Sequence, residues 1–222
     1  MSALAIFDLD NTLITCDSDV QWAAFLGEEG IFDANDAIQR EKFHQDYCSG
    51  CLNVDEFLRF QLAPLAKFTL PELKTMHQKF MTRHILPNIT ATAKNLVQNH
   101  IDKGDELLLI SATNEFIITP IAHQFGIKNI IGVRLERDEK GNFTGGYVGV
   151  PSFREGKVAR LSEWLSARGQ TLHSFECSYF YSDSFNDLPL LEQVSVPVAV
   201  NPDEILAQHA QQKGWRVLKF TK

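Results

Sequence analysis

Long apolar runs are missing from this 222-residue sequence, which excludes a membrane-spanning helix. The N-terminal segment has no basic residues and too short an apolar run for a signal peptide. A basic excess is missing too, because 21 Lys and Arg stand against 28 Asp and Glu, a net charge of −7. Such a chain is a poor binder of nucleic acid or of an anionic membrane. We therefore expect a cytoplasmic protein with neither partner, and we infer no obligate protein partner.

Cysteine is also scarce, at four residues. Cys48 and Cys51 form a single CxxC pair, which is found in redox pairs and in half of a zinc site. No second CxxC or spaced histidine pair completes a zinc site, and no strand–helix unit precedes the pair as in thioredoxin-like motifs. We expect ordinary reduced thiols, and we assign none of the seven histidines to a metal.

What the sequence does contain is a series of short apolar runs that end in polar residues. Residues 3–8, 106–111 and 175–183 end in Asp8, Ser111 and Asp183, as buried parallel strands do at their carboxyl ends. Further strands are predicted at 129–133, 197–200 and, at an edge, 215–220. Helical patterns lie between them at 88–103, at 115–125 and from about Arg154, where Val158, Leu161 and Leu165 share one face. This alternation predicts an α/β fold with a doubly wound, Rossmann-like parallel sheet.

Two segments depart from that alternation. Residues 134–148 contain two strand-like runs around Lys140-Gly141-Asn142, which predicts a β-hairpin flap. Residues 16–86 have almost no β-branched runs and predict an insert of about four helices. Asn53 with Glu56, and Thr69 with Glu72, have the spacing of capping boxes. We therefore expect an α/β core domain of residues 1–15 and 87–222, and a helical cap domain of residues 16–86.

Acidic residues gather where the predicted strands end. Ligands of such sheets bind outside the carboxyl ends of the strands. Asp8 and Asp10 follow the first strand, and Asp183 and Asp187 follow a later one. Four carboxylates at one place repel one another unless a cation lies among them, and oxygen ligands in that number suit Mg²⁺. No organic cofactor is implied.

Groups suited to a phosphate are expected beside that cation. Ser111 supplies a hydroxyl and Lys157 a positive charge, and Ala112-Thr113 are expected at the start of a helix. Backbone N–H groups at helix N-termini bind phosphate oxygens. A metal, a lysine and N–H donors around one point stabilise a transferring phosphoryl group, and a carboxylate such as Asp8 can attack phosphorus to form an acyl phosphate.

Four motifs in this order resemble those of the haloacid dehalogenase-like superfamily. Asp8-Leu9-Asp10-Asn11-Thr12 resembles its DxDxT signature, and Ser111, Lys157 and Asp183-Ser-Phe-Asn-Asp187 resemble its second, third and fourth motifs. The helical insert between the first two motifs is similar to the cap of the phosphoserine phosphatase-like branch. A second Asp in the first motif marks the phosphatases of the superfamily, which disfavours a dehalogenase.

The resemblance implies a role for each residue in a phosphatase that uses an aspartyl-phosphate intermediate. Asp8 is the implied nucleophile and Mg²⁺ ligand, and Asp10 the general acid, whose backbone carbonyl also binds Mg²⁺. Asp183 is the third protein ligand, and Asp187 orients the metal-bound waters and Lys157. Ser111, Lys157 and Asn186 contact the phosphate.

The insert is expected to select the phosphate ester. Asp17 occupies the place of a Glu that grips the substrate ammonium in phosphoserine phosphatases. The alternative is that Asp17, Ser18 or Asp19 caps a helix beginning near Val20. Neither Arg40 nor Arg59 falls at the family's carboxylate-binding Arg, which argues against phosphoserine.

Some bacterial members of this branch resemble histidinol-phosphate phosphatases, and a substrate with an ammonium and an imidazole but no carboxylate suits an acidic insert. Phosphoserine and other small phosphomonoesters stay open as substrates, as does a phosphotransferase or mutase that uses the same intermediate. A binding module without activity is disfavoured, because the carboxylates and the lysine are all present.

Overall fold

A seven-stranded sheet forms the centre of the computed structural model, which describes residues 2–32, 34–48 and 51–220. Within those ranges the strand order is β4-β3-β2-β1-β5-β6-β7. All neighbouring strands are parallel except β3 and β4. The strands are β1 (Leu4–Phe7), β2 (Glu106–Asn114), β3 (Asn129–Arg137), β4 (Phe143–Val148), β5 (Ser178–Ser182), β6 (Val196–Val200) and β7 (Arg216–Leu218). The predicted doubly wound α/β class is confirmed.

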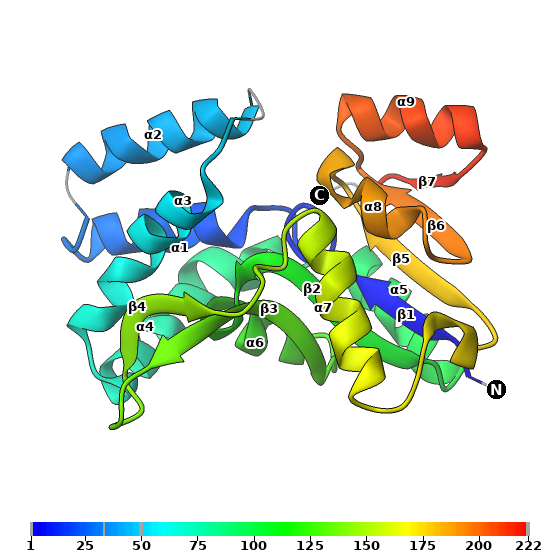
Figure 1. Ribbon diagram of the computed structural model, residues 1–222. Coiled ribbons are helices and arrows are strands. Elements are labelled where there is room, and N and C mark those ends of the chain that lie inside the picture. The colour runs from blue at the N-terminus through cyan, green and yellow to red at the C-terminus, as the bar shows by residue number, and fades with distance from the viewer. Residues whose placement is uncertain (1, 33, 49–50, 221–222) are drawn as a thin grey trace.

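The central strand β1 is buried on both faces, as its continuous apolar sequence predicts. Leu4 and Ile6 face one layer of helices, and Ala5 and Phe7 face the other. The layer beside Phe7 contains α5 (Ala91–Asp102) and α6 (Glu115–His123). The layer beside Ile6 contains α7 (Glu155–Ser166), α8 (Leu188–Leu191) and α9 (Glu204–Lys213). Figure 1 shows α7 in front of the sheet and α6 behind it.

Between β1 and β2 the chain is helical, as predicted. The elements are α1 (Ser18–Glu28), α2 (Ala34–Cys48), α3 (Val54–Leu62), η1 (Ala63–Lys67), α4 (Leu70–Phe80), the π-helical turn η2 (Met81–Ile85) and η3 (Leu86–Asn88). Thr69 and Glu72 form the predicted capping box of α4, and Asn53 caps α3 through the backbone N–H of Glu56. These elements, blue to cyan in Figure 1, are called the insert below. Its separation as a domain of residues 16–86 stays a prediction.

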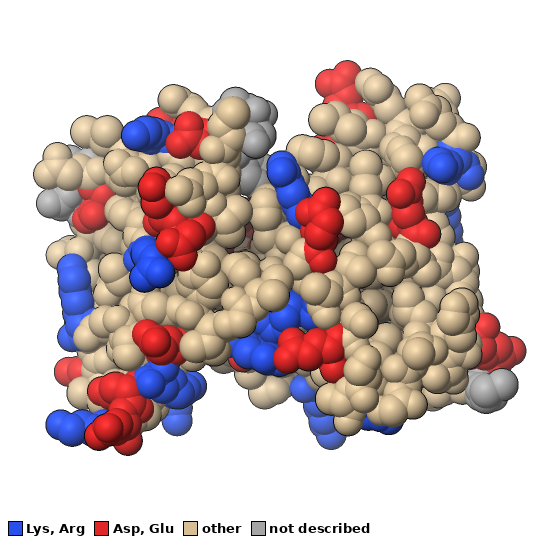
Figure 2. Space-filling model, viewed as in Figure 1, with Lys and Arg blue, Asp and Glu red and all other residues tan. Residues whose placement is uncertain are grey.

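The two connections between the insert and the sheet lie side by side. Ile14 and Ile89 form an isolated antiparallel bridge, and the backbone N–H of Thr15 donates to the carbonyl of Asn88 at 3.0 Å. The space-filling view has a deep notch between the insert and the part of the sheet that carries α8 and α9 (Figure 2). The N-terminal end of α7 lies below this notch (Figure 1).

The predicted flap is an antiparallel hairpin of β3 and β4. Its strand β4 packs on the insert, where Tyr147 Oη donates to Asp55 Oδ1 at 2.9 Å. Gly145, at φ 84°, lies so close to η1 that an added Cβ would stand 3.2 Å from the Cα of Ala63. The flap therefore connects the sheet edge to α3 and η1.

The expected helix directly after Ser111 is wrong, because β2 continues to Asn114 and α6 begins at Glu115. The side chain of Cys48 lies outside the described residues, so the CxxC pair receives no structural test.

Candidate active site

The parallel ladders bring the predicted site residues to one edge of the sheet. Phe7 pairs with Leu109 on β2 and with Tyr181 on β5, so the residues that follow these three strands are neighbours. The backbone N–H of Asp8 donates to the carbonyl of Tyr181 at 2.9 Å. Asp8 therefore lies between the ends of β2 and β5.

Lys157 is the centre of the buried charge network at this edge. Its Nζ donates to Asp8 Oδ1 at 2.8 Å and to Asp187 Oδ2 at 2.7 Å, and the residue is 3% exposed. Burial alone would lower the pKa of Lys157, but the carboxylates of Asp187 and Asp8 outweigh it and raise that pKa. Ser182 Oγ also donates to Asp187 Oδ2, at 2.6 Å. The lysine is therefore held as a cation between strand ends.

A tight loop after Asp10 places Thr12 between Asp8 and Asp183. Asn11 adopts φ 55°, a left-handed conformation that Asn tolerates better than most residues, and the chain folds back after Asp10. Thr12 Oγ1 then lies 3.4 Å from Asp8 Oδ2 and 3.3 Å from Asp183 Oδ1. The two carboxylates thus share one hydroxyl neighbour although they are far apart in sequence.

Asp10 faces the start of α1 and the end of β2. Its Oδ1 accepts from the backbone N–H of Ser18 at 2.6 Å, and its Oδ2 accepts from Thr113 Oγ1 at 3.0 Å. Ser111 Oγ lies 3.4 Å from the same Oδ2. Burial raises the pKa of Asp10 well above its usual value, and the charges of Asp17 and Asp8 raise it further. A carboxyl with a raised pKa is suited to donate a proton.

Residues 111–113 form an irregularity in β2, because the pairing with β3 shifts register between Ile110 and Asn114. Bulges of this kind re-aim side chains beside active sites. The backbone N–H of Thr113 donates to Ser111 Oγ at 3.0 Å, and Ser152 Oγ holds the Ser111 carbonyl at 2.6 Å. Ala112 therefore lies in a strand bulge and not at a helix N-terminus, which corrects the environment expected for its N–H.

Asn186 has a partner that sequence reasoning missed. Arg154 Nε donates to Asn186 Oδ1 at 2.8 Å, and Asn186 is 5% exposed. Arg154 has φ 50° and ψ −123°, a strained conformation for any residue with a side chain. The nearby Gly156 is close-packed, since an added Cβ would stand 2.0 Å from the carbonyl oxygen of Pro151. The glycine just before Lys157 in the sequence is the one signal that indicates an unusual backbone at residues 154–156.

The structure separates the roles of two acids at the start of α1. Asp17 caps the helix, because its Oδ1 accepts from the backbone N–H of Val20 at 2.9 Å. Asp19 faces the site instead, because its Oδ2 accepts from Thr113 Oγ1 at 3.2 Å. Burial raises the pKa of Asp19 to about 7, with a further increase from Asp17 and opposing contributions from Gln61, Arg40 and Thr113. Sequence reasoning named Asp19 only as a possible helix cap.

Thr113 therefore bridges two carboxyls. A threonine hydroxyl has one proton to donate, so it satisfies only one of Asp10 and Asp19 at a time. The Thr113 hydroxyl and the two carboxyls interact most favourably when one of the carboxyls holds a proton. Asp19 of the insert is therefore coupled, through the Thr113 hydroxyl, to the carboxyl of Asp10.

The donor set was tested against a divalent cation. Burial raises the pKa of Asp8 to about 6 against the opposing charge of Lys157. Burial, with the charges of Asp8 and Asp187, raises the pKa of Asp183 to about 8. Buried carboxylates that repel one another fit a cation among them. Among the described residues no group of three His, Cys, Asp or Glu side chains is arranged to hold a metal ion, so a cation here would rest on two carboxylates, a backbone oxygen and water, which are ligands that suit Mg²⁺.

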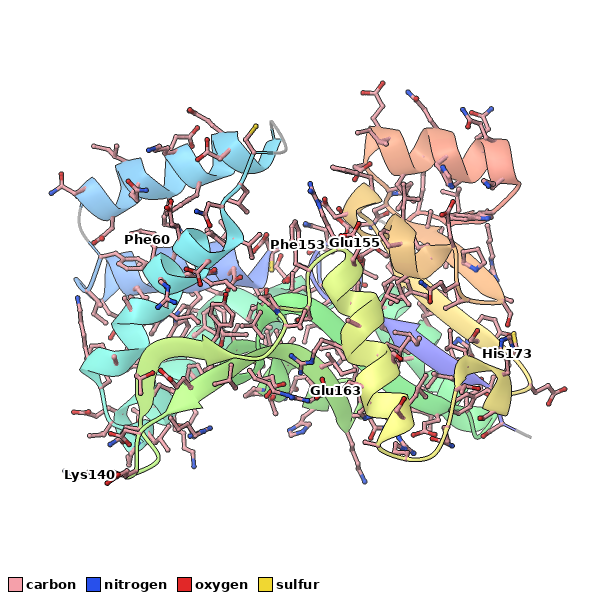
Figure 3. All side chains as sticks on the ribbon, in the orientation of Figure 1. Phe60, Lys140, Phe153, Glu155, Glu163 and His173 are labelled. Carbon is pink, nitrogen blue, oxygen red and sulfur yellow. The ribbon has the colours of Figure 1, made fainter. Side chains whose placement is uncertain are left out.

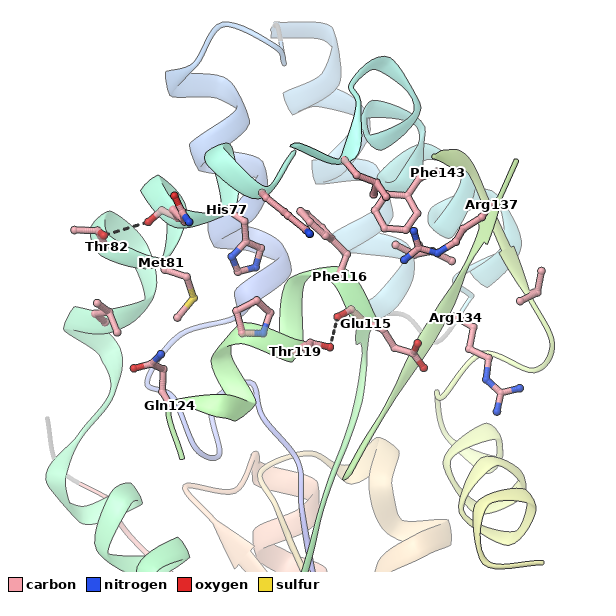
Figure 4. Close-up of a pocket in the computed structure, with 17 residues that line it drawn as sticks. His77, Met81, Thr82, Glu115, Phe116, Thr119, Gln124, Arg134, Arg137 and Phe143 are labelled. Atoms are coloured by element: carbon pink, nitrogen blue, oxygen red, sulfur yellow. Dashed lines mark hydrogen bonds between the residues drawn. The ribbon is translucent and has the colours of Figure 1, made fainter. Parts of the chain in front are cut away.

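A separate cavity of about 980 Å³ lies between α4, η2, α6 and the flap. Figure 4 shows His77 and Met81 on one side and Arg134, Arg137 and Phe143 on the other. None of the residues around Lys157 lines it.

The family model that describes haloacid dehalogenase-like hydrolases matches residues 5–192. The chain belongs to this family. A histidinol-phosphatase of Neisseria meningitidis serogroup C (strain 8013) is 55% identical over 221 residues, which cover 99% of this chain and 100% of that protein. The family and this relative identify the chain as a phosphoric monoester hydrolase.

Solved structures agree on the fold. A protein of unknown function from Bordetella pertussis Tohama I superposes with a TM-score of 0.92 at 43% identity, covering 98% of both chains. A substrate-bound phosphoserine phosphatase superposes with a TM-score of 0.68 at 17% identity, covering 98% of this chain and 93% of the other, which shows a shared fold alone. Within the described part of this hydrolase, no helix has the length and apolar character to cross a membrane.

Proposed function

We propose that this hydrolase is a Mg²⁺-dependent phosphatase of the cytoplasm that converts histidinol phosphate to histidinol and phosphate. The observation that carries the proposal is the meeting of Asp8, Asp10, Asp183 and Lys157 at one edge of the sheet. Similarity to the Neisseria histidinol-phosphatase supports the choice of substrate.

The first step is transfer of the phosphoryl group to Asp8. A carboxylate oxygen of Asp8 attacks phosphorus, the ester P–O bond breaks, and an acyl phosphate forms. The leaving oxygen takes a proton from Asp10, whose raised pKa keeps that proton available. The alcohol then leaves uncharged.

The second step is hydrolysis of the acyl phosphate. Asp10, now a carboxylate, removes a proton from water as the water oxygen attacks phosphorus. The bond between phosphorus and the Asp8 oxygen breaks, inorganic phosphate leaves, and both aspartates return to their starting states. The Ser18 N–H holds Asp10 in place for both steps.

Phosphate oxygens are bound by Lys157, by Ser111 Oγ, by the N–H of Ala112 and by the amide of Asn186. Lys157 is already fixed by Asp187, so little side-chain entropy is lost when phosphate arrives. The side-chain carbonyl of Asn186 accepts from Arg154, and its NH₂ group, which carries two hydrogens, donates to Ser184 Oγ at 3.3 Å.

Mg²⁺ would be held by the carboxylates of Asp8 and Asp183 and by the backbone carbonyl of Asp10, with Asp187 orienting its waters. When bound, it supplies positive charge that offsets the charge of the phosphoryl oxygens and of the clustered acids. The chain contributes the buried acids, which repel one another without such a cation.

The charge of the insert supports a cationic substrate. Arg40 Nη2 donates to the carbonyl of Asp19 at 3.3 Å, and burial lowers the pKa of Arg40 against the opposing charges of Asp19 and Asp17. Arg59 is exposed and paired with Asp55 at 2.8 Å. Arg59 is therefore paired with an acid, and the charges of Asp19 and Asp17 offset that of Arg40, which disfavours a substrate carboxylate such as that of phosphoserine.

The test compares phosphate release from L-histidinol phosphate and from L-phosphoserine at equal concentration with Mg²⁺. We expect faster release from histidinol phosphate, and release without any added acceptor, which separates a phosphatase from a phosphotransferase. Faster turnover of phosphoserine contradicts the proposed substrate. Phosphate release that survives chelation of the metal contradicts the proposed cofactor.

A further inference from the structure

Buried polar atoms without partners gather at one place in the insert. Within the described ranges, Ser18 Oγ, Asp19 Oδ1 and Trp22 Nε1 on α1 and the amide of Gln61 on α3 have no partner within hydrogen-bond geometry. The Ser18 hydroxyl and the Gln61 amide lie only near enough to the carboxyls of Asp10 and Asp19 to lower their pKa values, against the larger rise caused by burial. Ser18 and Gln61 are 0% and 4% exposed. A buried polar group without a partner is costly, and native proteins keep few of them. A group of them calls for a ligand or for bound water.

These atoms belong to one site. Ser18 and Asp19 are one turn before Trp22 on α1, so the three residues share a helix face. Gln61 lies close enough to Asp19 for its amide to lower the pKa of that carboxyl, although burial raises that pKa more strongly. Figure 1 shows α1 and α3 within the insert, and Figure 3 labels Phe60, the neighbour of Gln61, on α3.

The site adjoins the reacting groups. The Ser18 backbone N–H donates to Asp10 Oδ1, and Thr113 Oγ1 lies between Asp10 Oδ2 and Asp19 Oδ2. A substrate whose phosphate lies beside Asp8 has its leaving oxygen at Asp10, so the rest of the molecule extends toward this face of α1. Asp17, in contrast, is occupied as the helix cap.

We infer that Asp19, Gln61 and Ser18 form the subsite that binds the ammonium-bearing end of the substrate and sets its specificity. This inference rests on the proposed function. The Asp19 carboxylate accepts from the ammonium, and the Gln61 amide, which both donates and accepts, binds a ring such as imidazole that has one N–H and one bare nitrogen. A substrate carboxylate would instead meet Asp19 and be repelled.

Hydrolysis of L-histidinol phosphate and of p-nitrophenyl phosphate, which has neither ammonium nor imidazole, tests the inference. We expect Asp19→Asn to lower kcat/KM for histidinol phosphate by about 30-fold, because a charge-assisted hydrogen bond is lost. For p-nitrophenyl phosphate we expect a smaller loss, caused through the Thr113 hydroxyl that Asp19 shares with Asp10, because its phosphate contacts stay intact and its nitrophenolate leaving group needs little protonation. Glu56→Gln, on the exposed side of α3, removes one negative charge elsewhere in the insert and should alter neither rate.

The variant Asp17→Asn tests whether Asp17 or Asp19 binds the ammonium of the substrate. Asn caps a helix as well as Asp does, so this variant removes charge and leaves α1 intact. We expect a smaller loss for histidinol phosphate than in Asp19→Asn. A selective loss in Asp17→Asn with none in Asp19→Asn overturns the inference, and so does an equal loss for both substrates in Asp19→Asn.

Gln61→Leu gives a second readout. If the amide is reserved for substrate, removing it raises the thermal midpoint of the free protein while kcat/KM for histidinol phosphate falls. A lowered midpoint with unchanged kinetics makes Gln61 a residue satisfied within the fold and overturns its assigned role.

Inhibition of p-nitrophenyl phosphate hydrolysis tests the subsite without assuming that histidinol phosphate is the substrate of this enzyme. The competitors are 2-aminoethyl phosphate and ethyl phosphate, which differ by one ammonium group. We expect Asp19→Asn to weaken inhibition by the first about tenfold and to leave the second unchanged. A wild type that prefers phosphoserine refutes the proposed substrate alone, whereas an unchanged ratio of the two inhibition constants refutes the subsite.

Discussion

Asp8 and Asp10 lie two residues apart, and their surroundings give them different chemistry. Burial raises the pKa of Asp8 to about 6, and the Lys157 ammonium at 2.8 Å limits that rise by favouring the charged form. Asp10 has neutral donors and two neighbouring acids, so its pKa is raised well above the usual value, first by burial and then by Asp17 and Asp8. An attacking carboxylate and a proton donor thus arise from one residue type.

Asp8→Asn should abolish turnover while the protein stays folded. The amide keeps the shape of the side chain but cannot attack phosphorus, so we expect kcat to fall by a factor of about 10⁴ or more. Single-turnover assays with p-nitrophenyl phosphate, together with a thermal melt, measure this. Activity within tenfold of the wild type contradicts the role of Asp8 as nucleophile.

Lys157→Met should destabilise the protein as well as inactivate it. The variant leaves the buried carboxylates of Asp8 and Asp187 without their cation. We expect the free energy of unfolding to fall by about 3–5 kcal/mol without Mg²⁺, as when one partner of a buried ion pair is removed. Urea unfolding measures it, and Lys74→Met, at an exposed position of α4, is the control that should change little.

Two substitutions of Arg154 separate the effect of its strained backbone from the effect of its hydrogen bond to Asn186. Arg154→Ala and Arg154→Gly both lose the hydrogen bond to Asn186, but only Gly adopts φ 50° and ψ −123° without strain. We expect a similar rise in KM for both, and an unfolding free energy about 1–3 kcal/mol higher for Gly than for Ala. Equal stability of the two variants, or an unchanged KM, argues against this role of the arginine.

Among the elements, the flap is the one whose contact with the insert can be isolated. Gly145 and Gly141 have φ of 84° and 83°, but only Gly145 has backbone within 4 Å of an added Cβ. Gly145→Ala should therefore cost about 1–2 kcal/mol more unfolding free energy than Gly141→Ala, because the two share the conformational penalty and differ in crowding against η1. Paired urea titrations measure the difference, and equal losses mean that the flap does not press on the insert.

Elements with a continuous apolar pattern were predictable, and those set by tertiary contacts were not. The apolar run Leu4–Phe7 predicted β1, because a strand that is buried on both faces consists of apolar residues. The start of α6 was misplaced because the bulge after Ile110 depends on pairing with β3. Asp8, Lys157 and Asp183 were found through motif spacing. Arg154 and Asp19 were missed because their partners, Asn186 and Thr113, lie 32 and 94 positions away.

At the scale of the molecule, the acidic cluster links stability to pH and metal. Asp8 and Asp183 have folded-state pKa values raised to about 6 and about 8. A raised carboxyl pKa stabilises the fold fully below the unfolded value and loses that contribution as pH rises through the folded value. We expect the metal-free protein to lose on the order of 5 kcal/mol of unfolding free energy between pH 5 and about 8.5.

Mg²⁺ should reverse that loss, and more strongly at the higher pH, because it binds the deprotonated acids. Thermal melts with and without Mg²⁺ across this range measure both effects. A metal-free protein that becomes more stable as pH rises has the opposite sign and contradicts the cluster's repulsion. Asp183→Asn should flatten the pH dependence.

The bridge between Ile14 and Ile89 has a consequence for engineering and for evolution. The chain leaves the sheet and returns to it at adjacent points, so a very short peptide could close the gap if everything between them were deleted. A module attached in this way can be exchanged for another without rethreading the sheet. Selectivity can therefore diversify by transplanting one contiguous stretch of gene, while the reacting aspartates stay where the scaffold holds them.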